Sequence, residues 1–263
     1  MMGKRTWLLI RGLAHEQEHW GKFREMLQKK YPDDEIFGVD LPGVGVYHKE
    51  TAPIGLKETL NIVRNNTLGE IRPPYYIISM SFGSMIAIEW AKSHPSDITG
   101  IVVMNTSIGK YSHFYNRLQS KTWRSFLKRV TTTDPAEIEK IILSITSSKT
   151  EGLDEVVQER VEIHRKRPVT IENILRQLVA AAIYRSDGEP PSVPTLILAG
   201  KGDRLCDPSC SKKISNEWNL PLRVHPTAGH DLTLDEPEWV LEEISKWVQQ
   251  VVTNVAKQVE DSV

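Results

Sequence analysis

The sequence predicts an α/β protein with a mainly parallel sheet, and three observations support this. Apolar runs of strand length alternate with stretches of helical period, which is the pattern of successive β-α-β units. The alternation is interrupted by a long stretch that has helical periodicity alone. A chain of 263 residues is also long enough to bury the core of one large domain. We expect an α/β core of residues 1–109 and 189–263, with an all-helical cap of residues 110–188 inserted into it.

Six short runs, most of them apolar and each bounded by polar or turn-forming residues, are predicted as strands. They are Trp7–Ile10, Ile36–Val39, Tyr75–Ser79, Ile101–Asn105, Thr195–Ala199 and Leu222–His225. Four stretches of helical period are predicted as the core helices that cover the sheet. They span residues 19–30, 56–66, 83–93 and 237–252, and residues 253–263 are expected to fray.

The cap is predicted to contain four helices separated by helix-breaking residues. They span residues 114–130, 135–147, 153–166 and 171–185. Asp134-Pro135, Gly152 and Pro168 lie between them, and proline and glycine are the residues that most often interrupt a helix. The first helix is rich in Lys and Arg and has no acidic residue. This basic stretch could bind an anionic group or form a solvated face, and the sequence leaves both interpretations open.

Composition and charge exclude several classes of partner and location. The net charge of −1 gives no reason to expect nucleic acid or an anionic membrane as a partner. The apolar run at residues 7–10 is too short for a signal-peptide core or a membrane span, so we expect a cytoplasmic protein. Cys206 and Cys210 are too few for a disulfide framework, and without clustered histidines they are poor evidence for zinc. Whether the chain forms a homo-oligomer or binds a protein partner is left open.

Three short segments that each follow a predicted strand carry hydroxyl, carboxylate and imidazole groups. They are Ser79-Met80-Ser81-Phe82-Gly83, Gly200-Lys201-Gly202-Asp203 and Ala228-Gly229-His230-Asp231. A serine hydroxyl is a weak nucleophile that needs a general base within hydrogen-bond reach. The order serine, acid, histidine along the chain is the order of the strand-turn-helix nucleophile elbow and its partners. The three segments therefore predict a nucleophilic serine assisted by a histidine and an aspartate.

With these motifs the chain resembles the α/β-hydrolase superfamily, and most of all its small serine esterase-like members with a helical cap. Arg11-Gly12-Leu13 followed by Trp20 looks like the oxyanion loop, and the residues from Asp40 to Gly45 look like the turn after the next strand. The resemblance implies an α/β-hydrolase fold of about six mainly parallel strands. Because the chain reaches the oxyanion strand at Trp7, we expect no leading antiparallel hairpin. The second strand is expected outside the first, followed by the third to the sixth.

The resemblance implies catalytic roles for three side chains and two backbone groups. Ser81 is implied as the nucleophile, and His230 as the base that later acts as the acid. Asp203 is implied as the group that orients the histidine and stabilises the imidazolium. The backbone N–H groups of Leu13 and Phe82 are implied as the oxyanion hole.

Two residues depart from the usual pattern of the superfamily. Ser79 stands where glycine is usual, and we expect the turn to survive with slightly altered packing. Arg11 stands where histidine is common; we expect it to pin the loop by a salt bridge, and binding an anionic substrate group is the alternative. Asp207 is the second choice for the acid, while Asp231 and Asp235 are expected to be helix-start carboxylates. Four other histidines are candidates to line the pocket: His15, His19, His48 and His113.

The predicted function is a serine hydrolase that cleaves a small carboxylic ester, thioester or lactone through an acyl-enzyme intermediate. The expected partner is a small ester-like molecule, with no metal, organic cofactor, nucleic acid or membrane. Two alternatives stay open because the fold and the triad do not fix the reaction. The first is a C–C bond hydrolase or lyase that uses the same triad. The second is a non-catalytic, ligand-binding or receptor-like member of the fold.

Overall fold

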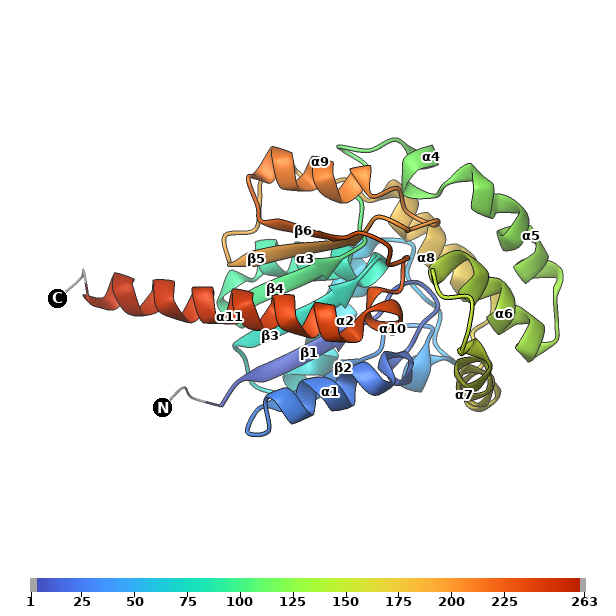
Figure 1. Cartoon of the computed structure of the whole chain (residues 1–263), viewed down its shortest axis with the longest axis horizontal. Helices are drawn as coiled ribbons and strands as arrows, with labels where there is room; N and C mark the ends of the chain where they lie inside the picture. Colours follow the sequence, from blue (N-terminus) through green and yellow to red (C-terminus); the bar gives the residue numbers. More distant parts are fainter. Residues whose placement is uncertain (1–3, 261–263) are drawn as a thin grey trace.

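The computed structural model describes the backbone of residues 4–260 and the side chains of residues 4–253. Its centre is a six-stranded sheet in the order β2-β1-β3-β4-β5-β6, in which every neighbouring pair is parallel (Figure 1). The strands are β1 (Thr6–Ile10), β2 (Glu35–Val39), β3 (Tyr75–Met80), β4 (Ile98–Met104), β5 (Thr195–Gly200) and β6 (Leu222–His225). The six predicted strands and their order are confirmed, and β1 is the first strand of the described residues.

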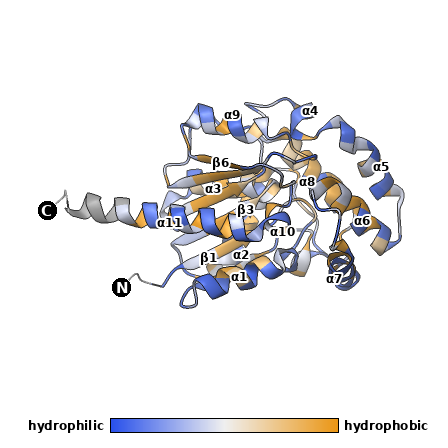
Figure 2. Cartoon of the chain, viewed as in Figure 1, coloured by the Kyte–Doolittle hydropathy of each residue, from blue (hydrophilic) through white to orange (hydrophobic). Residues whose placement is uncertain are grey.

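Helices cover both faces of the sheet and bury its apolar side chains. One face is covered by α1 (Lys22–Lys30) and α11 (Pro237–Glu260), and the other by α2 (Leu56–Glu70), α3 (Phe82–Ser93) and α9 (Ser209–Trp218). Trp7 and Leu9 enter the first layer, whereas Leu8 and Ile10 enter the second, because successive side chains of a strand alternate between faces. In Figure 2 hydrophobic residues are concentrated along the central strands, whereas hydrophilic residues are frequent along α1, α7 and α9. None of the described helices combines the length and hydrophobicity that a membrane-spanning helix needs.

Five helices, called the inserted helices below, lie between β4 and β5. They are α4 (Phe114–Arg117), α5 (Trp123–Thr131), α6 (Pro135–Thr146), α7 (Leu153–Lys166) and α8 (Ile171–Ile183). Figure 1 shows them gathered beyond one end of the sheet, opposite the end at which both termini lie. The described structure has no strand between β4 and β5, in agreement with the helical periodicity of this stretch. Its division from the core at residues 110 and 188 stays a prediction.

Capping residues explain why the later inserted helices begin where the sequence predicts. The side chain of Asp134 accepts a hydrogen bond from the N–H of Glu137, and Pro135 occupies the first turn of α6. The side chain of Thr170 accepts from the N–H of Asn173 in the same way at the start of α8. Asp and Thr caps bind N–H groups that have no partner within the helix, and proline is tolerated at that position because it has no N–H.

Two predicted helices are broken in the structure. The predicted helix over residues 114–130 is divided because Gln119 is extended and bonded to the loop after β5: its N–H donates to Leu205 O at 2.9 Å and its side chain donates to Asp203 O at 2.9 Å. A 3₁₀ turn, Ser120–Thr122, then leads into α5. The predicted helix over residues 19–30 is interrupted at Gly21, whose φ of 47° and ψ of −135° are not helical. A 3₁₀ turn therefore precedes α1.

Three further expectations about helices need correction. The sequence analysis missed α9 and the short α10 (Leu232–Asp235). The last helix, α11, continues to Glu260 rather than ending at residue 252, and fraying of its continuation from residue 253 stays a prediction. The remaining part of that prediction, residues 261–263, lies outside the described residues.

Candidate active site

Ser81 lies in the tight turn between β3 and α3. Its φ of 53° and ψ of −118° place a non-glycine residue in a region of backbone space that L-residues rarely adopt. A Cβ atom on Gly83 would lie 2.3 Å from Arg11 O and 2.7 Å from Ile10 O, so only glycine fits there. The loop after β1 also presses on the turn, since a Cβ atom on Gly12 would lie 3.0 Å from the Cβ of Ser81. Close packing of two loops therefore fixes where the hydroxyl can lie.

Ser79, the departure from the usual pattern, is accommodated inside the sheet. Its side chain is fully buried, and its Oγ lies 3.0 Å from Val102 O and 3.2 Å from the Oγ of Ser84. Ser84 in turn accepts a hydrogen bond from the N–H of Met104 at 3.2 Å. A buried hydroxyl costs little when it is hydrogen-bonded, which explains how the turn keeps its shape without glycine at this position.

His230 and Asp203 form a hydrogen-bonded pair. The Nδ1 of His230 lies 2.7 Å from the Oδ2 of Asp203, and both side chains are buried. The other carboxylate oxygen of Asp203 accepts from the N–H groups of Leu205 and Cys206 at 2.8 and 2.9 Å. Donation from Nδ1 leaves the Nε2 of a neutral His230 free to accept a proton. Asp207, the second choice for this role, accepts instead from the N–H of Ser209 at the start of α9.

Asn105, which the sequence analysis did not select, holds the loop that carries His230. Its φ is 46°, and its side-chain amide donates to Gly229 O at 3.0 Å and to His230 O at 2.8 Å. Its carbonyl oxygen accepts from the N–H of Gly200 at 2.9 Å, so one side chain joins the ends of β4 and β5 to the histidine loop. Its position directly after β4 was the one signal that could have identified it.

Ser81 and His230 line one cavity of about 320 Å³, together with Leu13 and Phe82. Much of the apolar lining comes from the inserted helices, including Phe126, Ile141, Ile142, Ile145, Ile174 and Leu178. Asp203 lies behind His230 and does not line the cavity. No hydrogen bond joins Ser81 Oγ to His230 in the described part of the chain. Such bonds are often long without substrate and tighten when it binds.

The four other histidines have different surroundings. His15 lines the large cavity, and its Nδ1 lies 2.8 Å from Leu13 O. Burial, followed by the nearby charges of Arg11 and Arg160, lowers the pKa of His15 to about 3. Burial also lowers the pKa of His19, which lines a separate cavity of about 40 Å³. The other two, His48 and His113, line neither cavity.

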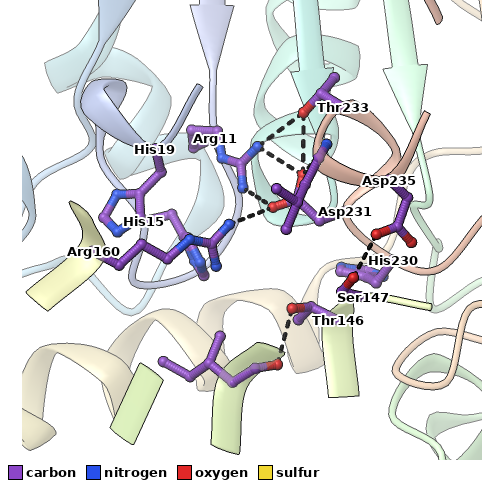
Figure 3. A network of polar contacts seen from close by, with 12 residues as sticks. Arg11, His15, His19, Thr146, Ser147, Arg160, His230, Asp231, Thr233 and Asp235 are labelled. Atoms are coloured by element: carbon purple, nitrogen blue, oxygen red, sulfur yellow. Dashed lines mark hydrogen bonds and ion pairs between the residues drawn. The ribbon is translucent and has the colours of Figure 1, made fainter. Parts of the chain in front are cut away.

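Arg11 makes the salt bridge that the sequence analysis expected of it. Its guanidinium binds both carboxylate oxygens of Asp231, at 2.7 and 3.2 Å (Figure 3). Asp231 does begin a helix, since it accepts from the N–H of Leu234 at the start of α10, but it also carries this buried ion pair. Asp235 lies in the single turn of α10, but its carboxylate bonds to groups outside that helix. Its carboxylate accepts from the N–H of Gly229 at 2.7 Å and from Ser147 Oγ at 2.5 Å.

The basic stretch at the start of the inserted helices divides between two environments. Arg117 donates to Ala181 O at 2.5 Å and to Ala182 O at 2.8 Å, which satisfies carbonyl groups at the end of α8. Arg117 and Arg129 also line the large cavity, whereas Arg124 is exposed. Whether this stretch binds an anionic group stays open.

Metal-ligating side chains are not clustered in the structure. Within residues 4–253, no three His, Cys, Asp or Glu side chains lie close enough together to hold a metal ion. Cys206 and Cys210 are buried free thiols. The cavity wall includes the hydroxyl of Ser81, the imidazoles of His15 and His230, and the thiol of Cys206.

Comparison with known protein families supports this picture. Residues 55–238 match the Hydrolase_4 family, described as serine aminopeptidase, S33. The chain belongs to the Hydrolase_4 family. This match covers well over half of the chain and identifies an enzyme of the α/β-hydrolase superfamily, as the motifs predicted.

Two curated proteins are similar in sequence. One is YqjL of Bacillus subtilis (strain 168), which is 32% identical over 88 residues; the match spans 31% of this chain and only 34% of YqjL. The other is the pimeloyl-[acyl-carrier protein] methyl ester esterase of Xylella fastidiosa (strain M12), which is 23% identical over 205 residues. That match spans 75% of this chain and 76% of the esterase.

Solved structures of hydrolases share the fold. A thermophilic esterase from Thermogutta terrifontis superposes with a TM-score of 0.72 at 20% identity, over 95% of this chain and 92% of that chain. The esterase EaEST from Exiguobacterium antarcticum gives a TM-score of 0.74 at 16% identity, over 94% and 93%. At such low identity these likenesses establish the fold alone, and the α/β-hydrolase fold is thereby confirmed.

Proposed function

We propose that the protein is a serine hydrolase that cleaves a small carboxylic ester, thioester or lactone. The observation that carries the proposal is the hydrogen bond of 2.7 Å from His230 to Asp203, beside a cavity that Ser81 and His230 both line. The positive φ of Ser81 adds to it, because a strained strand-to-helix turn is how this fold exposes a nucleophilic serine. Similarity to a methyl ester esterase favours ester hydrolysis over other reactions on the same fold.

In the proposed mechanism His230 moves one proton in each half of the reaction. Its Nε2 takes the proton from Ser81 Oγ as the oxygen attacks the carbonyl carbon, and then gives that proton to the departing alcohol or thiol. The acyl group is left as an ester of Ser81. Water attacks this ester with His230 again as the base, which releases the acid and restores the hydroxyl. Asp203 holds the ring with Nδ1–H donating and stabilises the imidazolium.

The backbone N–H groups of Leu13 and Phe82 are proposed to bind the oxyanion. Both residues line the cavity, and the N–H of Phe82 lies in the first turn of α3, where N–H groups have no partner within the helix. The peptide that follows Leu13 is held on both sides. Its carbonyl lies 2.8 Å from the Nδ1 of His15, and its N–H, on Ala14, donates to Gln177 Oε1 at 2.9 Å. One oxyanion donor is typically worth about 10²–10³ in kcat.

The cavity suggests the class of substrate. Its volume of about 320 Å³ is near the lower limit of small-molecule pockets. Isoleucine and leucine side chains from α6 and α8 make up much of the wall beyond Ser81. An apolar acyl group fits such a wall, since each buried methylene contributes about 0.8 kcal/mol. We therefore expect p-nitrophenyl butyrate to be a better substrate than p-nitrophenyl acetate.

Reaction with a fluorophosphonate probe tests the proposal. We expect the probe to label Ser81, as mapped by mass spectrometry, and both p-nitrophenyl esters to be hydrolysed. Ser81→Ala is expected to lose labelling and turnover while remaining folded by circular dichroism. Ser120→Ala, which changes an exposed serine, serves as the control and should react as the wild type does. A folded wild-type protein that neither reacts with the probe nor turns over esters would refute the proposal and favour a ligand-binding role.

A further inference from the structure

Asp231, the residue after His230, has a carboxylate that two guanidinium groups share. Arg11 binds both of its oxygens, and the Nη2 of Arg160 lies 2.9 Å from Oδ2 (Figure 3). All three side chains are between 2% and 4% exposed. The hydroxyl of Thr233 completes the cluster by donating to Oδ1 at 3.1 Å.

The cluster connects three parts of the chain that are far apart in sequence. Arg11 belongs to the loop that carries Leu13, Asp231 belongs to the histidine loop, and Arg160 comes from α7 of the inserted helices. A second contact holds the histidine loop to α6, because the N–H of Asp231 donates to Thr146 O at 2.8 Å. Asp231 therefore links the inserted helices to two core loops: its own loop, which carries the proposed base His230, and the loop of Arg11, which carries Leu13 of the proposed oxyanion hole.

Charge within the cluster is unbalanced. Arg11 and Arg160 contribute two positive charges, and Asp231 contributes one negative charge; burial alone would raise the pKa of Asp231, but the two guanidinium groups hold it well below its usual value. The Nη1 of Arg160 is buried without a hydrogen-bond partner in the described structure, as is the Oε2 of Glu139 on α6. A buried ion cluster of this kind contributes little to stability compared with apolar residues of the same size.

We propose that Arg160 is a positioning residue for His230 and for the N–H of Leu13, and that it acts through Asp231 and Arg11. The inference rests on the proposed function, since it assigns these two groups their catalytic roles. Arg160 does not line the cavity, so it does not touch the substrate. Its bond to Asp231 fixes the carboxylate that Arg11 also binds, and thereby fixes the spacing between the histidine loop and the oxyanion loop. Catalysis is sensitive to such spacing, because a displacement of about 1 Å can cost about a hundredfold in rate.

The test compares Arg160→Met with a matched control on the same helix, Arg165→Met. Arg165 is exposed, and among the described residues its one ion pair is with Glu162, one turn away. Three quantities are measured for each variant: the second-order rate constant for phosphonylation of Ser81, kcat and KM for a p-nitrophenyl ester, and the urea midpoint of unfolding. The phosphonylation rate constant is taken per reactive site, so a partly unfolded sample does not lower it.

For Arg160→Met we expect the phosphonylation rate constant and kcat to fall about tenfold or more, with KM within about twofold of the wild type. The urea midpoint is expected to change little, because Arg11 and Asp231 remain as a matched pair. Arg165→Met is expected to react like the wild type. If Arg160→Met does not fold, Arg160→Lys replaces it. The phosphonylation rate constant is then expected to fall about threefold or more, because lysine lacks the planar guanidinium group with its fixed set of donors.

Two results would overturn the proposal. The first is a phosphonylation rate constant equal to that of the wild type, whatever the stability of the variant. The second is a raised KM with unchanged kcat, which would make Arg160 a determinant of substrate binding. Failure of the proposed function is distinguishable from both, because then the wild-type protein itself would not react with the probe.

Discussion

The later inserted helices, α7 and α8, are attached to the core in a different way from the earlier ones, α4 and α5. The later helices, α7 and α8, bury polar side chains that bond to core loops: Arg160 to Asp231, Asn173 to the N–H of Ala52, and Gln177 to the N–H of Ala14. The earlier helices, α4 and α5, bury none of their residues fully. Their apolar side chains are instead largely exposed: Phe114 by 67%, Trp123 by 47% and Leu127 by 67%.

This difference shows which inserted helices belong to the catalytic framework. The N–H groups of Ala14 and Ala52 have their hydrogen-bond partners on α8. Without those partners, buried backbone groups of this kind would destabilise the folded protein. Undocking α7 or α8 would therefore disrupt the loops that carry Leu13 and His230. In contrast, α4 and α5 contribute to the wall of the cavity, through residues such as Phe114 and Phe126, without holding those loops. We expect sequence changes in α4 and α5 to alter substrate choice while the catalytic groups stay in place.

The largest effect in this comparison is expected from Gln177→Leu. The side chain is 2% exposed; it accepts from the N–H of Ala14 and donates to Pro42 O at 3.1 Å. Leucine leaves both backbone groups unsatisfied, at about 1–3 kcal/mol each. We expect the free energy of unfolding in urea to fall by about 2–6 kcal/mol and phosphonylation of Ser81 to slow.

The control for this change is Leu175→Gln on the same helix. Leu175 is 45% exposed, so the substitution should alter stability by no more than about 0.5 kcal/mol. Equal losses of unfolding free energy for Gln177→Leu and Leu175→Gln would show that α8 is held by its apolar face alone. The distinction between the later helices (α7 and α8) and the earlier helices (α4 and α5) would then fail.

An intermediate effect is expected from the pH dependence of stability. The pKa of His15 in the folded protein is about 3, against an ordinary value of 6.5, so the unfolded chain binds more protons between these values. Stability from this residue is complete above 6.5 and is lost as the pH falls toward 3. The pKa of Asp231 is also lower in the folded protein than its ordinary value, so Asp231 too contributes less stability as the pH falls. Its contribution is lost only below the ordinary pKa of an aspartate, which is a lower pH range than that of His15.

His15→Asn tests the contribution of the histidine. Asparagine retains a donor that can reach Leu13 O but has no titratable group. Urea unfolding at pH values from about 7 to about 4 should show a flatter decline for the variant than for the wild type. Identical slopes for both proteins would contradict burial of a neutral His15 beside Arg11 and Arg160.

The smallest effect is expected from Leu127→Ser on α5. Leu127 is 67% exposed and does not line the cavity, so we expect a change in stability within about 0.5 kcal/mol. Thermal unfolding and kcat should match those of the wild type. A loss above about 1 kcal/mol would show that α5 buries this side chain against another surface, and the earlier helices would then be attached as firmly as the later ones.

Much of the sheet was predictable because buried parallel strands leave a local signal. Continuous apolar runs such as Trp7–Ile10 are identifiable without knowledge of their neighbours. Ser81 and Asp203 were also predictable, since each follows such a run, whereas His230 follows the partly exposed edge strand β6 and was identified by the glycine before it and by its place after Ser81 and Asp203 in the chain. The structure brings His230 and Asp203 into hydrogen-bond contact. Their catalytic roles stay a prediction.

The features that sequence analysis missed depend on long-range contacts. The break after Arg117 arises because Gln119 bonds to residues after β5, which are 84 positions or more away. Asp231 was expected only to start a helix, because its partners Arg11 and Arg160 lie 220 and 71 positions distant. No local periodicity reports such pairs, so they become visible only once the loops are placed side by side.

The shared carboxylate of Asp231 also sets the order in which the cluster can change during evolution. A lineage that loses Asp231 first leaves two guanidinium groups buried without a counter-charge, at about 3–5 kcal/mol. Such a loss is a large part of the 5–15 kcal/mol or so by which proteins are stable, so few of these intermediates would persist. A lineage that loses Arg160 first keeps a neutral pair and remains folded. Among descendants of this chain, we expect the substitution of Arg160 to precede that of Asp231.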